Sequence, residues 1–452
     1  MDLEAAYLSL PLPLQKVALN LEGWRLERRR YAPPYPKIES DVISRAGLTG
    51  ADLLNYQARR LEQQIQSALS SPFWKKRFRH FGLRLGAADP FTELMKLPVL
   101  TKPEVKADAE SIVNPDIDPK TLNSRHTSGT TGSGLKFWET RDCERETWAT
   151  WWRYRYWHGL TKETWCGYFG GRSLVALKQQ SPPYWRKNFA GHQLMFSAYH
   201  LGQATAKEYF SALTHNGIEW LHGYPSIISL LAKNMVALGI EYRPKIISLG
   251  AESLTSPQRS AIIEAFPDAL LIQHYGQAEA VANISQCTYG ALHVDEDFSW
   301  AEFMPLPDQP GLFRLIGTNW TNAAYPLFRY DTGDIVSLNE PACSCGSSWR
   351  VVGDIDGRIE DFVELPNGAK VGRLDHIFKD MVNIAEAQIR QEVTGNLIIS
   401  VVKGVAYSAK DEMALLDEAR KRLGNEIKIG IEYCESIPRT RSGKLRLVVK
   451  TG

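Results

Sequence analysis

The chain has 452 residues, of which 44% are hydrophobic and 23% charged, and its formal net charge is +2. This length allows a large core and more than one domain, at about 100–200 residues per domain. The small net charge argues against a nucleic-acid or anionic-membrane partner, and no apolar run approaches the ~20 residues of a membrane-spanning helix.

The N-terminus, Met1-Asp-Leu-Glu-Ala-Ala, is acidic and lacks the basic start and apolar stretch of a signal peptide. Six cysteines in a chain of this length do not indicate a disulfide framework, so we expect a reducing compartment. We therefore expect a cytoplasmic protein without a nucleic-acid or membrane partner. A homodimer is left open.

Residues 1–100 are predicted to be mostly helical, since apolar residues recur at helical spacing over 53–85. From about 120 to 350, short apolar runs alternate with helix-like segments. The predicted strands cover 164–169, 220–223, 245–249 and 269–274, and the predicted helices cover 205–216, 226–238 and 257–265. This alternation indicates an α/β fold whose ligands bind on loops beyond the strand ends.

A segment rich in glycine and aspartate begins at Gly353 and interrupts this pattern. We place a domain boundary there, with a large domain over 1–356, helical over about 1–100, and a small α+β domain over 357–452. The small domain is predicted to contain a hairpin over 362–371 that turns at Asn367-Gly368, a strand over 397–403 and a helix over 410–423.

The loop from Thr127 to Lys136 is the most informative segment, because three glycines, five hydroxyl residues and a final lysine fall within ten residues. Glycines let backbone N–H groups turn inward around an anion, and the hydroxyls and the lysine add donors and positive charge. A nucleotide triphosphate is the expected ligand. The loop lacks the Gly-x-x-x-x-Gly-Lys-Ser/Thr pattern of a Walker A motif.

Five further motifs follow this loop in order: Gly250-Ala-Glu252, Tyr275-Gly-x-x-Glu279, Tyr330-Asp-Thr-Gly-Asp334, Gly357-Arg358 and Arg441-Ser-Gly-Lys444. Together they resemble the adenylate-forming superfamily of acyl-CoA ligases, peptide-synthetase adenylation domains and luciferase-like enzymes. Segments 70–74, 97–102 and 223–226 are more similar to the phenylacetate-CoA ligase branch with its capsule-biosynthesis relatives. The resemblance runs from about residue 60 to the end.

The resemblance implies a large adenylate-forming domain of mixed sheets and helices, followed by a small mobile domain. It also implies the reaction: ATP and a carboxylate give acyl-AMP and pyrophosphate, and a thiol, with coenzyme A as the leading candidate, then displaces AMP. Two alternatives stay open. The acyl group is transferred to an amine, hydroxyl or carrier protein in polysaccharide or secondary-metabolite biosynthesis, or the chain binds a nucleotide without catalysis.

The resemblance assigns the nucleotide to a set of residues that grip the phosphates, flank the adenine and hold the ribose. They are Thr127, Ser128, Gly129, Thr130, Thr131, Gly132, Lys136, Gly250, Ala251, Glu252, Tyr275, Gly276, Gln277, Asp334 and Arg358. Tyr275 is expected to stack on the base and Asp334 to accept hydrogen bonds from the ribose hydroxyls.

The same resemblance implies two catalytic residues. Lys444 would bridge the carboxylate and the α-phosphate, and Glu279 would bind Mg²⁺, which prefers carboxylate oxygens. The family usually has Thr or Ser before this glutamate, whereas Ala278 stands here, so one phosphate contact is missing or comes from Gln277. Glu360 falls at the family's hinge position between the two half-reactions.

Two further sets of residues complete the expectations. The acid substrate would lie near Tyr168, Phe169, Tyr199, His222, Tyr224 and Pro225, whose rings favour a flat or aromatic acid. Three cysteines and one histidine suffice for tetrahedral zinc, and some members of this branch carry a structural zinc at the positions matching Cys287, His293, Cys343 and Cys345. The expected cofactors are therefore ATP, Mg²⁺, coenzyme A and a structural zinc ion, and the expected partners are a small-molecule acid and its acceptor.

Overall fold

The computed structural model describes residues 3–126, 135–252, 254, 256–306, 310–338, 343–356, 363–371, 374–378, 381, 383–404, 406–435, 437–438 and 447–450. Several predicted site residues lie outside this set: Thr127 to Gly132, Arg358, Glu360 and Lys444. Their roles stay predictions. Among the described residues, none of the helices is both long and apolar enough to span a bilayer.

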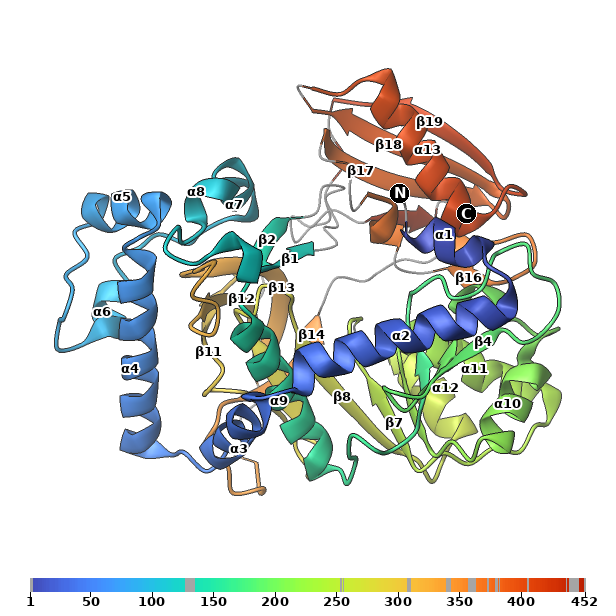
Figure 1. The fold of residues 1–452 in the computed structure, drawn as a ribbon, viewed down its shortest axis with the longest axis horizontal. Helices are drawn as coiled ribbons and strands as arrows, with labels where there is room; N and C mark the ends of the chain where they lie inside the picture. The colour runs from blue at the N-terminus through green and yellow to red at the C-terminus, as the bar shows by residue number, and fades with distance from the viewer. Residues whose placement is uncertain are drawn as a thin grey trace.

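Helices make up most of the first 112 residues, as the sequence predicts (Figure 1). They are α1 (Leu3–Ser9), α2 (Leu12–Tyr31), α3 (Tyr35–Arg45), α4 (Gly50–Ala68), α5 (Pro72–His80), α6 (Pro90–Leu94), α7 (Lys102–Ala107) and α8 (Ala109–Ile112). Local signals explain where they begin. Helix α5, for example, starts at Pro72 after Ser71, whose hydroxyl accepts a hydrogen bond from the Trp74 N–H.

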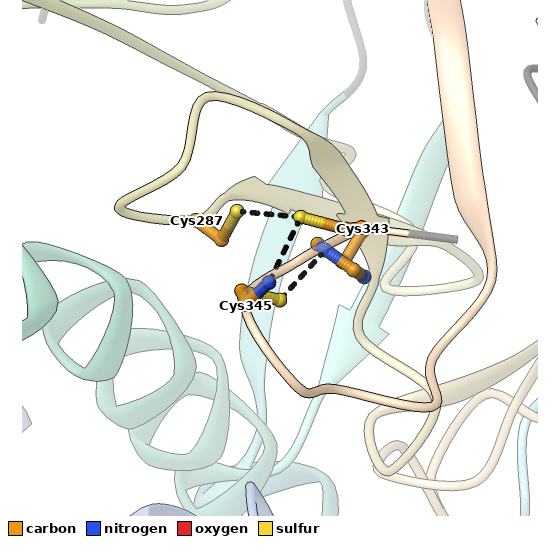
Figure 2. A group of neighbouring side chains, drawn as sticks. Cys287, Cys343 and Cys345 are labelled. Carbon is orange, nitrogen blue, oxygen red and sulfur yellow. Dashed lines mark hydrogen bonds between the residues drawn. The ribbon is translucent and has the colours of Figure 1, made fainter. Parts of the chain in front are cut away.

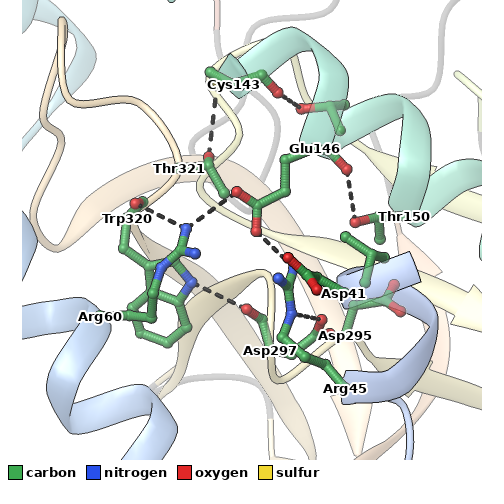
Figure 3. A network of polar contacts seen from close by, with 12 residues as sticks. Asp41, Arg45, Arg60, Cys143, Glu146, Thr150, Asp295, Asp297, Trp320 and Thr321 are labelled. Carbon is green, nitrogen blue, oxygen red and sulfur yellow. Dashed lines mark hydrogen bonds and ion pairs between the residues drawn. The ribbon is translucent and has the colours of Figure 1, made fainter. Parts of the chain in front are cut away.

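A polar network fastens these helices to the rest of the chain (Figure 3). The guanidinium of Arg45 in α3 binds Glu146 and Asp297, and Arg60 in α4 binds Glu146 and the carbonyl of Trp320. Glu146 lies on α9 (Arg141–Trp157), so one carboxylate holds α3 and α4 against α9. Since charged hydrogen bonds require defined geometry, this network sets how α3 and α4 lie against α9.

Twelve strands form the main sheet, in the order β11-β12-β13-β14-β10-β9-β8-β7-β6-β3-β5-β4. Their bounds are β3 (Cys166–Phe169), β4 (Trp185–Asn188), β5 (Gln193–Phe196), β6 (Trp220–Gly223), β7 (Ile246–Leu249), β8 (Leu270–Gly276), β9 (Asn283–Gln286), β10 (Leu292–Val294), β11 (Ser299–Pro305), β12 (Leu312–Asn319), β13 (Tyr330–Leu338) and β14 (Val351–Asp356). The neighbours β8, β7, β6, β3 and β5 are parallel, and the remaining pairs are antiparallel.

The parallel part of this sheet is covered on both faces, which suits a doubly wound arrangement. Side chains alternate along each strand, so Phe169, Leu221 and Leu249 pack into one cluster with α10 (Ala206–His215), α11 (Pro225–Leu238) and α12 (Ser256–Ala265). Cys166 and Trp220 face the other way and pack with Trp152 and Tyr154 of α9. The strands β6 and β3 approach closely, because a Cβ at Gly223 would lie 2.7 Å from the Phe169 Cβ.

The C-terminal elements form a second unit (Figure 1). Strands β15 (Val363–Glu364) and β16 (Lys370–Val371) make the predicted hairpin, and a four-stranded sheet has the order β19-β18-β17-β20. The bounds are β17 (Ile384–Val393), β18 (Asn396–Lys403), β19 (Lys428–Tyr433), β20 (Val448–Lys450) and α13 (Ala409–Leu423). Buried side chains of these strands and α13 share one core. The α/β fold class is therefore confirmed, while the domain boundary at 356/357 stays a prediction.

The remaining elements are the strands β1 (Asn123–His126) and β2 (Lys136–Glu139) and the short 3₁₀ turns η1 (Pro119–Thr121), η2 (Ala198–His200) and η3 (Leu374–Phe378). Strands β1 and β2 pair in antiparallel register, with His126 opposite Lys136. The predicted phosphate loop therefore connects two paired strands.

Candidate functional site

Asp334 lies at the centre of a group of predicted nucleotide residues. It is 6% exposed, and its Oδ2 atom accepts hydrogen bonds from the Tyr275 hydroxyl at 2.7 Å and from Gln277 Nε2 at 2.9 Å. Tyr275 and Gly276 end β8, whereas Asp334 belongs to β13, which is not a neighbour of β8 in the sheet. The fold thus brings together residues that the sequence could relate only by their order.

Gln277 is directed at the same carboxylate. Its Nε2 donates to Asp334, while its Oε1 is a buried oxygen with no hydrogen-bond partner among the described residues. A buried acceptor without a donor is unfavourable. The Gln277 Oε1 atom can therefore accept a hydrogen bond from a ligand. To replace the hydroxyl that contacts the phosphate in related enzymes, Gln277 would have to donate a hydrogen bond.

Glu279 lies next to this group, two residues after Gln277. It is 8% exposed, and Tyr330 at the start of β13 donates a long hydrogen bond of 3.5 Å to its Oε1. Its backbone carbonyl accepts a hydrogen bond of 3.1 Å from Asn319. The glutamate is thus held on both its side chain and its backbone. A carboxylate in this position can ligate Mg²⁺, and Glu279 would supply that ligand.

Two non-glycine residues in these loops have left-handed backbone conformations. Ala251, in the loop after β7, has φ of 70°, and Ala280, next to Glu279, has φ of 55°. Such conformations cost on the order of 1 kcal/mol or more for residues with a Cβ, and they cluster where a site needs a special backbone path. Glu252 follows Ala251 and is half-buried, and a Cβ at Gly250 would lie 3.4 Å from the His274 carbonyl oxygen.

The phosphate-loop lysine is the one member of that loop's predicted set that the structure describes. Lys136 begins β2, is exposed, and its Nζ lies 5.6 Å from the centre of the Trp138 ring. Its contact with a phosphate stays a prediction.

The predicted acyl-binding residues divide between the two faces of the sheet. Tyr168 and His222 pair across β3 and β6 and lie on the α9 face, with ring centres 5.7 Å apart. Phe169 points to the opposite face, where it is fully buried and stacks on Phe196 at 4.6 Å. Because adjacent strand residues point to opposite faces, Tyr168 and Phe169 cannot line one pocket, and Phe169 is a core residue.

Tyr199 also lies elsewhere than expected. It is 4% exposed, its hydroxyl donates to the Gly171 carbonyl at 3.3 Å, and it packs in the core cluster of the C-terminal unit. Tyr199 therefore connects the large sheet's loops to the C-terminal unit. Tyr224 and Pro225 are buried at the N-terminus of α11, and Tyr224 packs in the cluster on the Phe169 face. Their contact with an acid stays a prediction.

Two histidines on the α9 face are held neutral. Burial, with the nearby Arg155 charge, lowers the pKa of His222 to about 3, and burial lowers the pKa of His274 to about 4. His222 Nδ1 lies 2.8 Å from Ser248 Oγ, and His274 Nε2 lies 3.0 Å from Asn283 Oδ1. At neutral pH these rings are therefore hydrogen-bonding groups without charge.

Three further residues of this layer, His274, Ser248 and Arg155, were not predicted from the sequence. Side chains alternate along β6, β7 and β8, which places His222, Ser248 and His274 on one face of the sheet. The same alternation, started from Tyr168 in β3, would have predicted Ser248 and His274 from the sequence. Arg155 has no such signal, because many arginines and tryptophans occur in α9.

Four metal-ligand side chains meet between β9, β10 and β14. The ligand atoms of Cys287, His293, Cys343 and Cys345 all lie within 4.8 Å of one another. Figure 2 shows the three cysteines pointing toward one another: the Cys287 and Cys343 sulfurs are 3.6 Å apart, and the Cys345 sulfur lies 3.3 Å from His293 Nε2. Zn–S bonds of about 2.3 Å in a tetrahedron give S···S edges of about 3.8 Å.

The histidine in this cluster is oriented for metal binding. Its Nδ1 donates to the Trp349 carbonyl at 2.9 Å, which fixes the tautomer and leaves the Nε2 lone pair for a ligand. Three thiolates and one imidazole fit zinc and leave no open position for a substrate. These residues would hold a structural zinc ion that links the turns after β9 and before β14.

Comparisons with known proteins extend the sequence resemblance to the whole chain. Residues 363–451 match the family described as the CapK C-terminal domain. The chain is 26% identical to protein CapK of Staphylococcus aureus over 448 residues, which covers 97% of each chain. It is also 26% identical to a phenylacetate-coenzyme A ligase of Thermus thermophilus over 273 residues, covering 50% of this chain and 60% of the relative.

Solved structures show the same fold. A 2-hydroxyisobutyryl-CoA ligase in its thioesterification state superposes with a TM-score of 0.54 at 17% identity, over 94% of this chain and 91% of that one. The motifs in order, the near full-length match to CapK and the shared fold agree with one another. The chain is therefore similar, over nearly its full length, to the capsule-biosynthesis relatives of the phenylacetate-CoA ligase-like branch, and these findings support its assignment to the adenylate-forming superfamily.

Proposed function

We propose that this chain activates a carboxylic acid as acyl-AMP and then transfers the acyl group to a thiol, with coenzyme A as the acceptor to test first. The observation that carries the proposal is the convergence of Tyr275, Gln277 and Asp334 beside Glu279, where the family motifs assign the nucleotide. The relatives include a phenylacetate-coenzyme A ligase, whose name describes an activity of this kind.

In the first half-reaction, a carboxylate oxygen attacks the α-phosphorus of ATP, and pyrophosphate leaves. Two anions must be brought together, so the site works by positioning and by neutralising charge. Asp334 would hold the ribose, Tyr275 would lie against the adenine, and Lys444 would bridge the carboxylate and the α-phosphate. Glu279 would keep Mg²⁺ on the phosphates, where the metal ion neutralises charge.

In the second half-reaction, the thiol sulfur attacks the acyl carbon and AMP leaves. In this proposal the C-terminal residues 357–452 rotate about Glu360 between the two steps, as hinge residues do in related enzymes. The acceptor decides the biological role. An amine, hydroxyl or carrier-protein thiol would give the same first half-reaction and a different product.

The experiment that tests the proposal is ATP–pyrophosphate exchange without an acceptor, using aryl, arylacetic and aliphatic acids. Acid-dependent exchange would establish adenylation, and product formation with coenzyme A would then identify the acceptor. Hydroxylamine, which traps acyl-AMP, serves as the acceptor-independent control. ATP binding without exchange for any acid would contradict the proposal and would indicate a nucleotide-binding protein.

We also propose zinc at the Cys287, His293, Cys343 and Cys345 cluster, as a structural ion. Two observations support this proposal: the four ligand atoms all lie within 4.8 Å of one another, and the tautomer of His293 is fixed by its hydrogen bond to the Trp349 carbonyl. The site lies outside the group around Asp334, so its role is to stabilise the fold.

A further inference from the structure

Arg155, on the face of α9 that covers the sheet, is a cation without a counter-ion among the residues that the structure describes. Its guanidinium lies over three indole rings, 4.9 Å from the centre of Trp152, 5.6 Å from Trp220 and 5.9 Å from Trp148. Its Nε is buried without a hydrogen-bond partner, and no ion pair joins the side chain to any residue in the described ranges. A charge in an aromatic, partly dry environment is costly unless an anion accompanies it.

The contrast with Arg153, two residues earlier on the same helix, shows that the lack of a partner is local. Arg153 is 1% exposed and donates to Asp295 at 2.7 Å and to Asp297 at 2.8 Å. Arg153 points to the opposite side of α9 and forms ion pairs through both terminal nitrogens, although its Nε, like that of Arg155, has no hydrogen-bond partner among the described residues. Arg155 points toward the sheet, where carboxylates are lacking among the described residues in contact with it.

Arg155 faces the same space as the predicted acyl site. Trp220, which it contacts, lies on one sheet face with His222 and Tyr168, and the Trp220 and His222 rings are 6.4 Å apart. The charge of Arg155 is close enough to act on the pKa values of both His222 and His274, although burial is the main cause of each shift. The Arg155 guanidinium and the imidazoles of His222 and His274 therefore share one layer between α9 and the sheet.

This layer continues to the loop that the family motifs assign to the adenylate. A Cβ at Gly250 would lie 3.9 Å from His274 Nδ1, so the Gly250 loop and His274 are in contact. Trp151 of α9 contacts His274 as well, with ring centres 5.2 Å apart. An acid whose carboxylate is activated beside Gly250 would extend along His274 and His222 and present its far end to Arg155.

Neighbouring groups add to the positive charge. Three guanidiniums, from Arg29, Arg30 and Arg125, share the buried carboxylate of Glu144, at 2.6, 3.5 and 3.2 Å. Arg125 also binds Glu139 at 2.6 Å. Arg30 lies 4.0 Å from the centre of the Trp148 ring, which Arg155 also contacts. Arg30 and Arg155 thus meet at this indole; Arg30 interacts with the carboxylates of Glu144 and Glu27, whereas Arg155 has no ion pair among the described residues.

We propose that Arg155 recognises a second anionic group at the far end of the acid, so that the substrate is a dicarboxylic acid. The inference rests on the proposed function and names the substrate class of that same site. A guanidinium binds a carboxylate through two parallel hydrogen bonds, and the surrounding indoles strengthen the attraction by excluding water. An acid with a neutral end would leave Arg155 unpaired, and such a site discriminates strongly.

The test compares matched acids that differ only at the far end: terephthalate against 4-methylbenzoate, and adipate against hexanoate. ATP–pyrophosphate exchange is measured for the intact protein and for Arg155→Gln, Arg155→Lys and the control Arg243→Gln, whose side chain is exposed and pairs with Asp268. In parallel, binding of terephthalate and 4-methylbenzoate without ATP is measured by calorimetry. Circular dichroism and ATP binding establish that each variant folds.

We expect kcat/KM for the diacid to exceed that for its neutral partner, and Arg155→Gln to lower it by about 100-fold while leaving the neutral acid within about threefold. Arg155→Lys should lie between, because it keeps the charge and loses the two-point geometry. Arg243→Gln should match the unchanged protein in every assay.

Three results would distinguish a failure of this inference from a failure of the proposed adenylation. Exchange that favours hexanoate or 4-methylbenzoate, with no effect of Arg155→Gln on the preference, would overturn this inference and leave adenylation in place. Exchange with none of the acids, but terephthalate binding that Arg155→Gln abolishes, would overturn the proposed adenylation and keep Arg155 as the anion site. Neither exchange nor Arg155-dependent binding would overturn both.

Discussion

The Tyr275 hydroxyl donates a hydrogen bond of 2.7 Å to Oδ2 of Asp334, across 59 residues of sequence. The two residues come from strands β8 and β13, which are separated by three strands in the sheet order. The tyrosine predicted to contact the adenine and the aspartate predicted to hold the ribose are therefore linked by a hydrogen bond. The hydrogen bond orients the Asp334 carboxylate, so a substitution at Tyr275 is expected to change the position of Asp334.

Replacing Tyr275 with Phe should therefore weaken nucleotide binding without unfolding the chain. Loss of one hydrogen bond to a carboxylate corresponds to about 1.5–3 kcal/mol, so we expect the Kd for ATP to rise by about tenfold or more. Asp334→Asn should weaken it further, because the ribose contact itself changes. Calorimetric titration with ATP measures both. Tyr289→Phe, at a tyrosine that is 66% exposed, is the matched control, and an unchanged Kd for Tyr275→Phe would contradict the linkage.

Lys444→Ala should act on the rate of acyl-AMP formation far more than on ATP affinity. The lysine is assigned to the charge that develops as the carboxylate meets the α-phosphate, and an interaction made in the transition state appears in kcat. Single-turnover formation of acyl-AMP and the Kd for ATP are the two measurements. The exposed Lys410 of α13 provides the control Lys410→Ala. Equal losses of rate and affinity would show that Lys444 acts as a simple binding residue.

Gly317→Ala should destabilise the chain near Glu279. A Cβ at this position in β12 would lie 2.2 Å from the Val281 carbonyl oxygen, and a backbone atom cannot rotate away as a side chain can. We expect a loss of about 1–3 kcal/mol in the free energy of unfolding, as for other overpacked sites, together with weaker Mg²⁺-dependent activity. Urea unfolding compares it with Gly202→Ala, where a Cβ meets nothing within 4 Å. Equal stabilities would mean that β12 and the backbone at Val281 move apart at little cost.

Stability should fall as the pH drops below about 6.5, in part through His222. Burial, helped by the Arg155 charge, lowers its folded-state pKa to about 3, whereas an unfolded histidine has a pKa of about 6.5. Between these values the unfolded chain binds the proton and the folded chain does not, so acid favours unfolding; above pH 6.5 the site makes no contribution.

His222→Gln should reduce the slope of the free energy of unfolding against pH between pH 6.5 and 4.5. The reduction should correspond to at most about one proton taken up on unfolding. The free energy of unfolding in urea, measured at pH 7.5, 6.5, 5.5 and 4.5, gives the slopes. His215→Gln, at an exposed histidine of α10, is the control and should keep the slope of the unchanged chain. Identical slopes for all three proteins would show that His222 is protonated in the folded state.

Zinc should purify with the chain at about one ion per molecule, and Cys343→Ser should lose it. Removal of the ion should lower the melting temperature, since the ligands join the turns after β9 and before β14. Elemental analysis and thermal unfolding with and without a chelator measure these effects. Cys434→Ser is the control, because Cys434 lies outside the four-residue cluster. A full complement of zinc in Cys343→Ser would exclude Cys343 as a ligand.

Much of the fold could be predicted from the sequence, because hydrophobic period and turn chemistry act locally. Helix α11, predicted over 226–238, spans Pro225–Leu238, starting at a proline and ending before Gly239, whose φ is 61°. The hairpin around Asn367-Gly368 forms as expected. Strand β8 runs two residues beyond the predicted end at 274, since its pairing with β9 extends it to Gly276.

The sequence by itself determined the parallel strands β3, β6, β7 and β8, the helices α10 to α12 and the order of the motifs, because each depends on residue type and local spacing, and the family resemblance supplied the four metal-ligand candidates. Only the tertiary structure decided which face of a strand a ring occupies, so that Tyr168 adjoins His222 while Phe169 is buried in the opposite core. It also left Arg155 without a counter-ion among the described residues and placed Asp334 beside the Tyr275 hydroxyl. Those relationships join segments far apart in the chain, and they depend on sheet order and helix packing, which local patterns do not specify.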